Sequence, residues 1–150
     1  MAAERKFQAL LNSAVNDGNQ DVLKNWIDQQ VNTKDIYQQT ALHKASRDGH
    51  LNIVKYLIQI GAQVDIKGVN DFTPLHNAVT KGHLEVVQHF INHGANIEAK
   101  DGDGWTPLLS AVINGHFEVV KRLIENGARI NVKSNNGTTP VGIANYEISC

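Results

Sequence analysis

Cysteine is almost absent from the sequence: the only one, Cys150, is the last residue. No disulfide can therefore form within the chain, and this usage is typical of a reducing compartment such as the cytoplasm or the nucleus. A basic excess is absent too, because 14 Lys and Arg against 15 Asp and Glu leave a formal charge of -1. Nucleic-acid binders and proteins of anionic membrane surfaces carry such an excess. We therefore expect neither a nucleic acid nor a membrane as the partner.

Long apolar runs are also missing. Charged residues follow the first methionine at once, at Glu4, Arg5 and Lys6, which does not fit a signal peptide. No stretch approaches the length that a membrane span requires. The 150 residues are 41% hydrophobic and 19% charged, which are ordinary values for one folded globular domain.

The chain contains an internal repeat. The segment Thr-Ala-Leu-His-Lys-Ala at 40–45 returns as Thr-Pro-Leu-His-Asn-Ala at 73–78, as Thr-Pro-Leu-Leu-Ser-Ala at 106–111 and as Thr-Pro-Val-Gly-Ile-Ala at 139–144, always 33 residues apart. Gly-His at 49, 82 and 115 and Gly-Ala at 61, 94 and 127 keep the same step. Three series in one register indicate a repeat architecture.

Each unit predicts two helices and a turn-rich connection. The threonine can cap a helix whose first residue is proline, and the glycine before each histidine can end it. The next segment has apolar residues at i, i+1, i+4 and i+5, as at Ile53, Val54, Leu57 and Ile58, which predicts an apolar stripe on a second helix. One helix pair cannot bury its own stripe, so neighbouring units must stack.

With its 33-residue period and T-P-L-H-x-A signature, the chain resembles the ankyrin repeat family. The resemblance implies an all-α solenoid of about four and a half helix-turn-helix repeats with projecting hairpin loops. We expect a single domain over 1–150, made of an N-terminal capping repeat (1–34), full repeats at 35–67, 68–100 and 101–133, and a partial repeat at 134–150.

The two ends depart from the pattern. The first unit reproduces the second-helix stripe at Val22, Leu23, Trp26 and Ile27, but it lacks the Gly-Ala step that follows. The last unit stops after one helix, so either a half-repeat closes the stack or the chain was cut from a longer one. We expect the cut, because Val141, Ile143 and Tyr146 would have little to pack against.

The family resemblance implies that the protein binds other proteins on a concave face. In ankyrin repeats this face consists of the hairpin tips and the exposed side of each first helix. The residues at these positions are Tyr37, Gln39, Asn70, Phe72, Asp103 and Trp105 in the hairpins, and Lys44, Arg47, Lys81, Ile113 and Asn114 in the first helices.

Phe72 and Trp105 occupy equivalent positions, and Tyr37 is slightly displaced from them. Burial against a neighbouring hairpin would explain these aromatic residues. We favour an aromatic ladder that anchors a partner, because aromatic residues dominate binding hot spots. Ile113 would extend the apolar strip, and Arg47 and Lys81 could steer an acidic segment.

The histidines follow the repeat. His43, His76, His50, His83 and His116 keep the 33-residue register, and the resemblance implies that they bridge the backbones of adjacent repeats. His89 and His93 have a spacing that can share a metal ion, but no third ligand accompanies them. Nothing combines a nucleophile with a base. We expect no metal, no cofactor and no enzyme activity.

One modification site follows from the resemblance. Ankyrin repeats are similar to substrates of an asparagine hydroxylase that acts on an Asn eight residues after a Leu, and Asn131 follows Leu123 at that spacing. Arg129 stands where those substrates carry an acid. The alternative is an asparagine that stabilises the hairpin.

Two further functions stay open. The chain could be the targeting domain of a longer enzyme or bacterial effector, or a passive structural spacer. Its many Asn, Ile and Lys residues hint at an AT-rich genome of a microbe living inside host cells, in which case the site of action would be the host cytosol.

Overall fold

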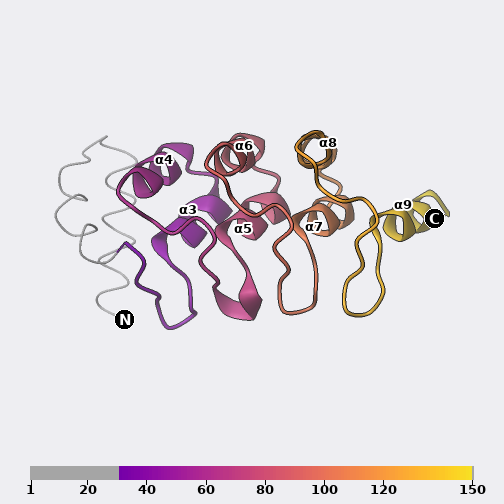
Figure 1. Ribbon diagram of the computed structural model, residues 1–150, viewed down its shortest axis with the longest axis horizontal. Coiled ribbons are helices and arrows are strands. Elements are labelled where there is room, and N and C mark those ends of the chain that lie inside the picture. Colours follow the sequence, from indigo (N-terminus) through magenta and orange to yellow (C-terminus); the bar gives the residue numbers. More distant parts are fainter. Residues whose placement is uncertain (1–30, 150) are drawn as a thin grey trace.

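The structure, a computed structural model, describes residues 31–149, with side chains as far as Ala144. Helix pairs stack along its longest axis (Figure 1): α3 (Ala41–Asp48) with α4 (Leu51–Gln59), α5 (Pro74–Lys81) with α6 (Leu84–Asn92), and α7 (Pro107–Ile113) with α8 (Phe117–Glu125), followed by α9 (Pro140–Ser149). The first helices form one layer and the second helices another, and the hairpins project beyond the first helices. No strand occurs in this part of the chain, and the all-α solenoid is confirmed.

The Thr-Pro pairs begin the first helices, as the sequence predicts. In α5 the Thr73 hydroxyl accepts from the amide of His76 and Pro74 is the first helical residue. Thr40 and Thr106 cap α3 and α7 in the same way. Proline fits the first position because the amide it lacks would have no partner inside the helix.

Gly49 and Gly82, each before a histidine, end the first helices α3 and α5 for two physical reasons. Gly82 has a φ of 75°, a left-handed conformation that side chains resist. A Cβ atom on Gly82 would also lie 2.6 Å from Nδ1 of His116 in the next repeat. The glycine therefore both stops α5 and allows the next repeat to approach.

The core runs between the two helix layers. The largest fully buried side chain among the described residues is Phe90, and the leucines that join it recur in each repeat at Leu42, Leu57, Leu75, Leu108 and Leu123. Each such side chain contributes about 1.5–3 kcal/mol on burial. Stacking makes this core continuous, so each repeat is stabilised by its neighbours.

Carboxylates shape two of the hairpins. One oxygen of Asp101 accepts from the amides of Asp103 and Trp105, at 2.9 Å each, and Asp35 binds two amides of the first hairpin in the same way. Glycine replaces the acid in the second hairpin, whose tip is a short turn of 3₁₀ helix, η1 (Val69–Asp71). The turn chemistry predicted for these segments is confirmed.

The structure tests the sequence predictions for only one of the two chain ends. The N-terminal stripe at Val22, Leu23, Trp26 and Ile27 lies outside the described residues. At the other end Val141 is 58% exposed, but Ile143 is buried at 8% exposure, so the expectation that Ile143 has little to pack against was wrong. α9 packs on α7, and this contact covers Ile143.

None of the helices described between residues 31 and 149 is long and apolar enough to cross a membrane.

Candidate functional site

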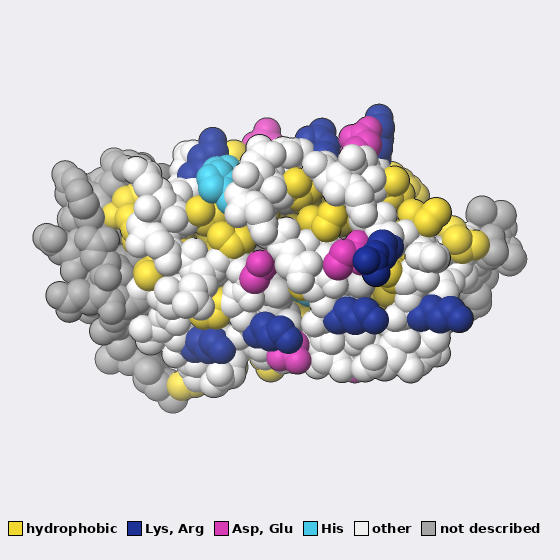
Figure 2. All heavy atoms as spheres, in the orientation of Figure 1, with side chains coloured by type: hydrophobic (Ala, Val, Ile, Leu, Met, Phe, Trp, Pro, Cys, Tyr) yellow, Lys and Arg dark blue, Asp and Glu magenta, His cyan; other side chains and the backbone are white. Residues whose placement is uncertain are grey.

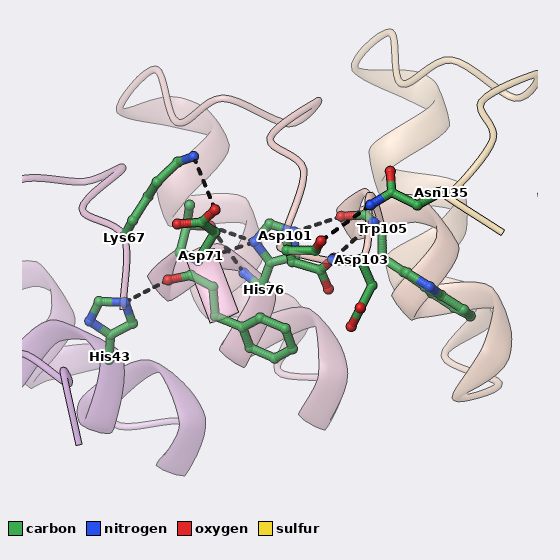
Figure 3. A network of polar contacts seen from close by, with 11 residues as sticks. His43, Lys67, Asp71, His76, Asp101, Asp103, Trp105 and Asn135 are labelled. Carbon is green, nitrogen blue, oxygen red and sulfur yellow. Dashed lines mark hydrogen bonds and ion pairs between the residues drawn. The ribbon is translucent and has the colours of Figure 1, made fainter. Parts of the chain in front are cut away.

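Histidines join adjacent repeats, so the scaffold interpretation is confirmed for four of them. Nε2 of His43 donates to the carbonyl of Phe72 at 2.9 Å, and Nε2 of His76 donates to the carbonyl of Trp105 at 3.1 Å (Figure 3). The residues after the glycines make a second set of bridges, from His83 to the Arg47 carbonyl and from His116 to the Thr80 carbonyl. The acceptor that the same step predicts for His50 lies outside the described residues.

The hairpin tips are also connected. The side-chain amide of Asn70 donates to the carboxylate of Asp103 at 3.2 Å, and the Asn70 carbonyl accepts from the amide of Gly102 at 2.8 Å. The amide of Asn135 then donates to the Asp103 carbonyl at 2.9 Å. Figure 3 shows Asp103 and Asn135 side by side in this network. Asn70 and Asp103 are exposed, but they help to fix the spacing of the hairpins.

Phe72 and Trp105 lie one residue before each helix cap, after the hairpin tip. Both are half-buried, and their carbonyls receive the histidine bridges described above. The Phe72 ring stacks on His76, with ring centroids 5.5 Å apart and planes 21° apart. Among the described side chains, no ring contact joins Phe72, Trp105 and Tyr37 to one another. Their exposed edges lie along the row of hairpins without forming a continuous stack.

Tyr37 is the most open aromatic residue on this side. Its side chain is 64% exposed, and its amide donates to Asp35 at 2.8 Å. Lys44, with a side chain only 11% exposed, lies 2.7 Å from the same carboxylate. Burial raises the pKa of Asp35, but the hydrogen bonds from Lys44 and from the amides of Gln39 and Tyr37 outweigh it and lower the pKa. Lys44 and Gln39 thus hold the turn that presents Tyr37.

The first helices present a mixed surface. Ile113 is 49% exposed, and Lys81 and Arg47 are exposed as well. The Arg47 guanidinium lies 3.2 Å from Asp48 of the same helix. The Asn114 side chain donates to the Ser110 carbonyl at 2.7 Å. Apolar area from Ile113 and positive charge from Arg47 and Lys81 therefore face solvent on this side.

A row of lysines was missed by the sequence reasoning. Lys34, Lys67, Lys100 and Lys133 keep the 33-residue step and are all exposed, and the step itself would have found them. Figure 2 shows Lys and Arg side chains in a row along the stack. Lys67 lies 3.8 Å from Asp71, and Lys100 donates to the Lys133 carbonyl at 3.5 Å. An acid and a carbonyl group therefore partly offset the positive charge of these lysines.

Asn131 occupies a position at which side chains tie one repeat to the next. The equivalent residues accept backbone hydrogen bonds: Asp65 from the amide of Asn96 at 2.9 Å, and Glu98 from the amide of Arg129 at 2.8 Å. Asn131 is exposed. Its hydroxylation and its role in stabilising the hairpin both stay predictions.

His89 and His93 lie close together on α6. Their ring centroids are 4.1 Å apart, and Nδ1 of His93 donates to the His89 carbonyl at 2.8 Å. Burial, above all, and the neighbouring charges of His93 and Lys55 lower the pKa of His89. The part of the chain that the structure describes holds no group of three or more His, Cys, Asp or Glu able to bind a metal ion.

Comparison with known proteins agrees with the geometry. A family model described as ankyrin repeats (three copies) matches residues 10–101 and 98–148. None of the curated proteins that were compared matches the chain. Ankyrin repeats are generally protein-protein interaction modules and are typically not catalytic. The histidine bridges, the stacked helix pairs and this match over most of the sequence show that the chain belongs to the ankyrin repeat family.

Proposed function

We propose that the domain holds an extended segment or a helix of a partner protein across the binding face, which we define as the hairpins together with the exposed side of α3, α5 and α7. The observation that carries this proposal is Tyr37, which is 64% exposed on a turn fixed by Asp35 and Lys44. A large aromatic side chain at a tight turn is costly to expose, and tyrosine is a frequent hot-spot residue.

The apolar and charged groups of this face suit a long, narrow ligand. Tyr37 belongs to the first described hairpin, and Ile113 lies two repeats further along, on α7. Neighbouring helices pack about 8–10 Å apart, so the separation along the stack is roughly 20 Å. About six residues of extended chain would cover it. Arg47 and Lys81 lie on the helices between these anchors and favour an acidic ligand.

The bound state needs little rearrangement of the domain. The hydrogen bonds between Asn70, Gly102, Asp103 and Asn135 fix the last three hairpins relative to one another before any partner arrives. A preorganised surface loses less conformational entropy on binding. We therefore expect a dissociation constant in the micromolar range.

Capture from cell lysate, followed by titration with the purified partner, tests the proposal. The variant is the double substitution Tyr37→Ala/Ile113→Ala, which leaves the core intact because both side chains are exposed. The control is Lys55→Ala, which removes an exposed side chain from α4, outside the binding face. We expect the double variant to lose partners that the control retains, with affinity lowered at least about tenfold. Equal retention by both variants would favour a passive spacer.

A further inference from the structure

The lysines that keep the 33-residue step lie along one side of the stack, at the base of the hairpins. The residue after each lysine begins the hairpin: the amide of Gly68, for example, donates to the carbonyl of Phe72 at 2.7 Å. Figure 2 shows Lys and Arg side chains lined up along the stack. We define the lysine row as Lys34, Lys67, Lys100 and Lys133.

Side chains point alternately inward and outward just before the hairpins. Ile66 is half-buried and Ala99 is buried, whereas the next residues, Lys67 and Lys100, are exposed. The side-chain ammonium of Lys100 lies 3.5 Å from the carbonyl of Lys133, so it reaches into the next repeat. The exposed lysines therefore follow one another along the stack from repeat to repeat.

The lysine row stays open whichever way the chain continues. Repeats are added at the ends of a stack, along its axis, and the row lies on its side. Lys67 lies between α4 and α5, and Lys100 lies between α6 and α7. Each of the two therefore has a described helix pair before it and another after it, and its exposure does not depend on either chain end.

The charges around the row favour a ligand whose negative charges are spaced apart. Among the described residues, Lys67 is the only lysine of the row in an ion pair, 3.8 Å from Asp71, with side chains 58% and 53% exposed. Water screens the attraction of such a pair. Asp65 and Glu98, each two residues before a lysine of the row, accept backbone amides of the next repeat.

These carboxylates separate a peptide from other anionic ligands. A nucleic acid or an anionic membrane carries negative charge on every unit, so it would meet Asp65, Asp71 and Glu98 as well as the lysines, and like charges repel. A peptide can place acids against the lysines and neutral residues against the carboxylates. The row therefore fits an acidic peptide best.

The spacing of the row selects the conformation of such a peptide. Adjacent first helices pack on one another, α5 on α3 and α7 on α5, and neighbouring helices lie about 8–10 Å apart. A polyproline II helix has three residues per turn and rises about 9.3 Å in that turn. Every third side chain thus lies on the same side at the interval of the repeats. In a β-strand, every third side chain alternates between the two sides.

We propose that the lysine row binds an acidic segment of a partner protein in the polyproline II conformation, with Asp or Glu at every third residue. Four such acids occur in about ten residues and match the four lysines. The 150-residue sequence has no acids at three successive positions of this spacing, so neither these residues nor a second copy of them supplies the segment. The row lies beside the binding face around Tyr37, and it can be occupied whether or not that face holds a partner.

Two peptides of equal composition test the proposal in NMR titrations of the isotope-labelled chain at low salt. One repeats Glu-Pro-Gln four times, because proline favours the polyproline II conformation. The other contains the same residues with the four Glu together. A single-stranded oligonucleotide of the same length is the third probe.

Paired variants locate the binding. Lys67→Gln/Lys100→Gln removes the two central charges of the row. Lys55→Gln/Lys121→Gln removes two exposed charges from α4 and α8 and makes the same change in net charge. The double substitution in the binding face described above is the third variant. Circular dichroism shows that each variant is folded.

We expect the regularly spaced peptide to bind with a dissociation constant of about 0.1–1 mM and to shift amides around the lysine row. The peptide with clustered Glu should bind at least about threefold more weakly, and Lys67→Gln/Lys100→Gln should weaken the regular peptide by at least about threefold. The other two variants should bind the regular peptide like the wild type.

Absence of binding, equal binding of the two peptides, or equal weakening by the two lysine variants would overturn the proposal. Loss of the regular peptide from the binding-face variant alone would overturn it too, because the peptide would then occupy that face. Tighter binding of the oligonucleotide than of the regular peptide would overturn it in favour of a nucleic acid.

Discussion

Replacing His76 with leucine should destabilise the domain and change its response to pH. The ring is fully buried. Nδ1 accepts from the Thr73 amide at 3.2 Å, and because an amide can only donate, the proton must be on Nε2, which donates to the Trp105 carbonyl. Leucine stands naturally at the equivalent position of the third repeat, at Leu109, so the fold accepts this side chain.

The size of the effect follows mainly from the lost hydrogen bonds to the Thr73 amide and the Trp105 carbonyl. At about 0.5–1.5 kcal/mol each, the free energy of unfolding should fall by about 1–3 kcal/mol. For a chain of this length, 1 kcal/mol corresponds to about 2–4 °C. Thermal unfolding followed by circular dichroism should therefore show a midpoint about 2–12 °C lower for His76→Leu at pH 7.5.

The pH dependence gives a second readout. Burial lowers the pKa of His76 from its ordinary 6.5 more than the Trp105 hydrogen bond raises it. Between the lowered pKa and 6.5 the unfolded chain binds more protons than the folded one, so stability falls as the pH falls through this range. Leucine removes this contribution. The gap between wild type and His76→Leu should narrow from pH 7.5 to pH 5, and a gap that stays constant or widens would refute the reasoning.

Four other substitutions probe the core, the repeat junction and the first hairpin. Phe90→Ala empties a fully buried site and should lower the free energy of unfolding in urea by about 3–5 kcal/mol. Gly94→Ala should lower the free energy of unfolding by about 1–2 kcal/mol through left-handed backbone strain alone, because the added Cβ atom meets nothing within 4 Å. Gly82→Ala should lower it more, because the added Cβ atom also meets His116. Equal losses in urea unfolding would contradict the tight junction between repeats. Asp35→Ala removes the acceptor of two hairpin amides and should speed their hydrogen exchange measured by NMR, without effect on amides in α6.

Most of the fold could be predicted from the sequence because residues within each repeat mark where its helices begin and end. Thr-Pro marks a helix start through the hydroxyl cap and the amide that proline lacks, and Gly82 marks an end through its left-handed backbone. The scaffold role of His43 and His76 was also accessible, since both keep the period. These sequence signals act within one repeat, and the structure adds the contacts between repeats.

The candidate site was harder to predict because exposure depends on contacts between repeats. Lys44 was expected on the binding face, but it lies against Asp35, an ion pair that forms only when the hairpin folds back onto α3. Phe72 was expected at a tip, but its ring stacks on His76. Ile143 is buried by packing between α9 and α7, which the spacing along the chain does not reveal.

The most direct test of the proposed binding face is site-specific photocrosslinking in cell lysate. A photoreactive phenylalanine analogue replaces Tyr37 or Ile113 on the face, or Lys55, which is exposed on α4, as the control. If the face binds a partner, the same protein is crosslinked from positions 37 and 113 and not from position 55. Crosslinking to no protein from the face, or to the same proteins from all three positions, would contradict the account.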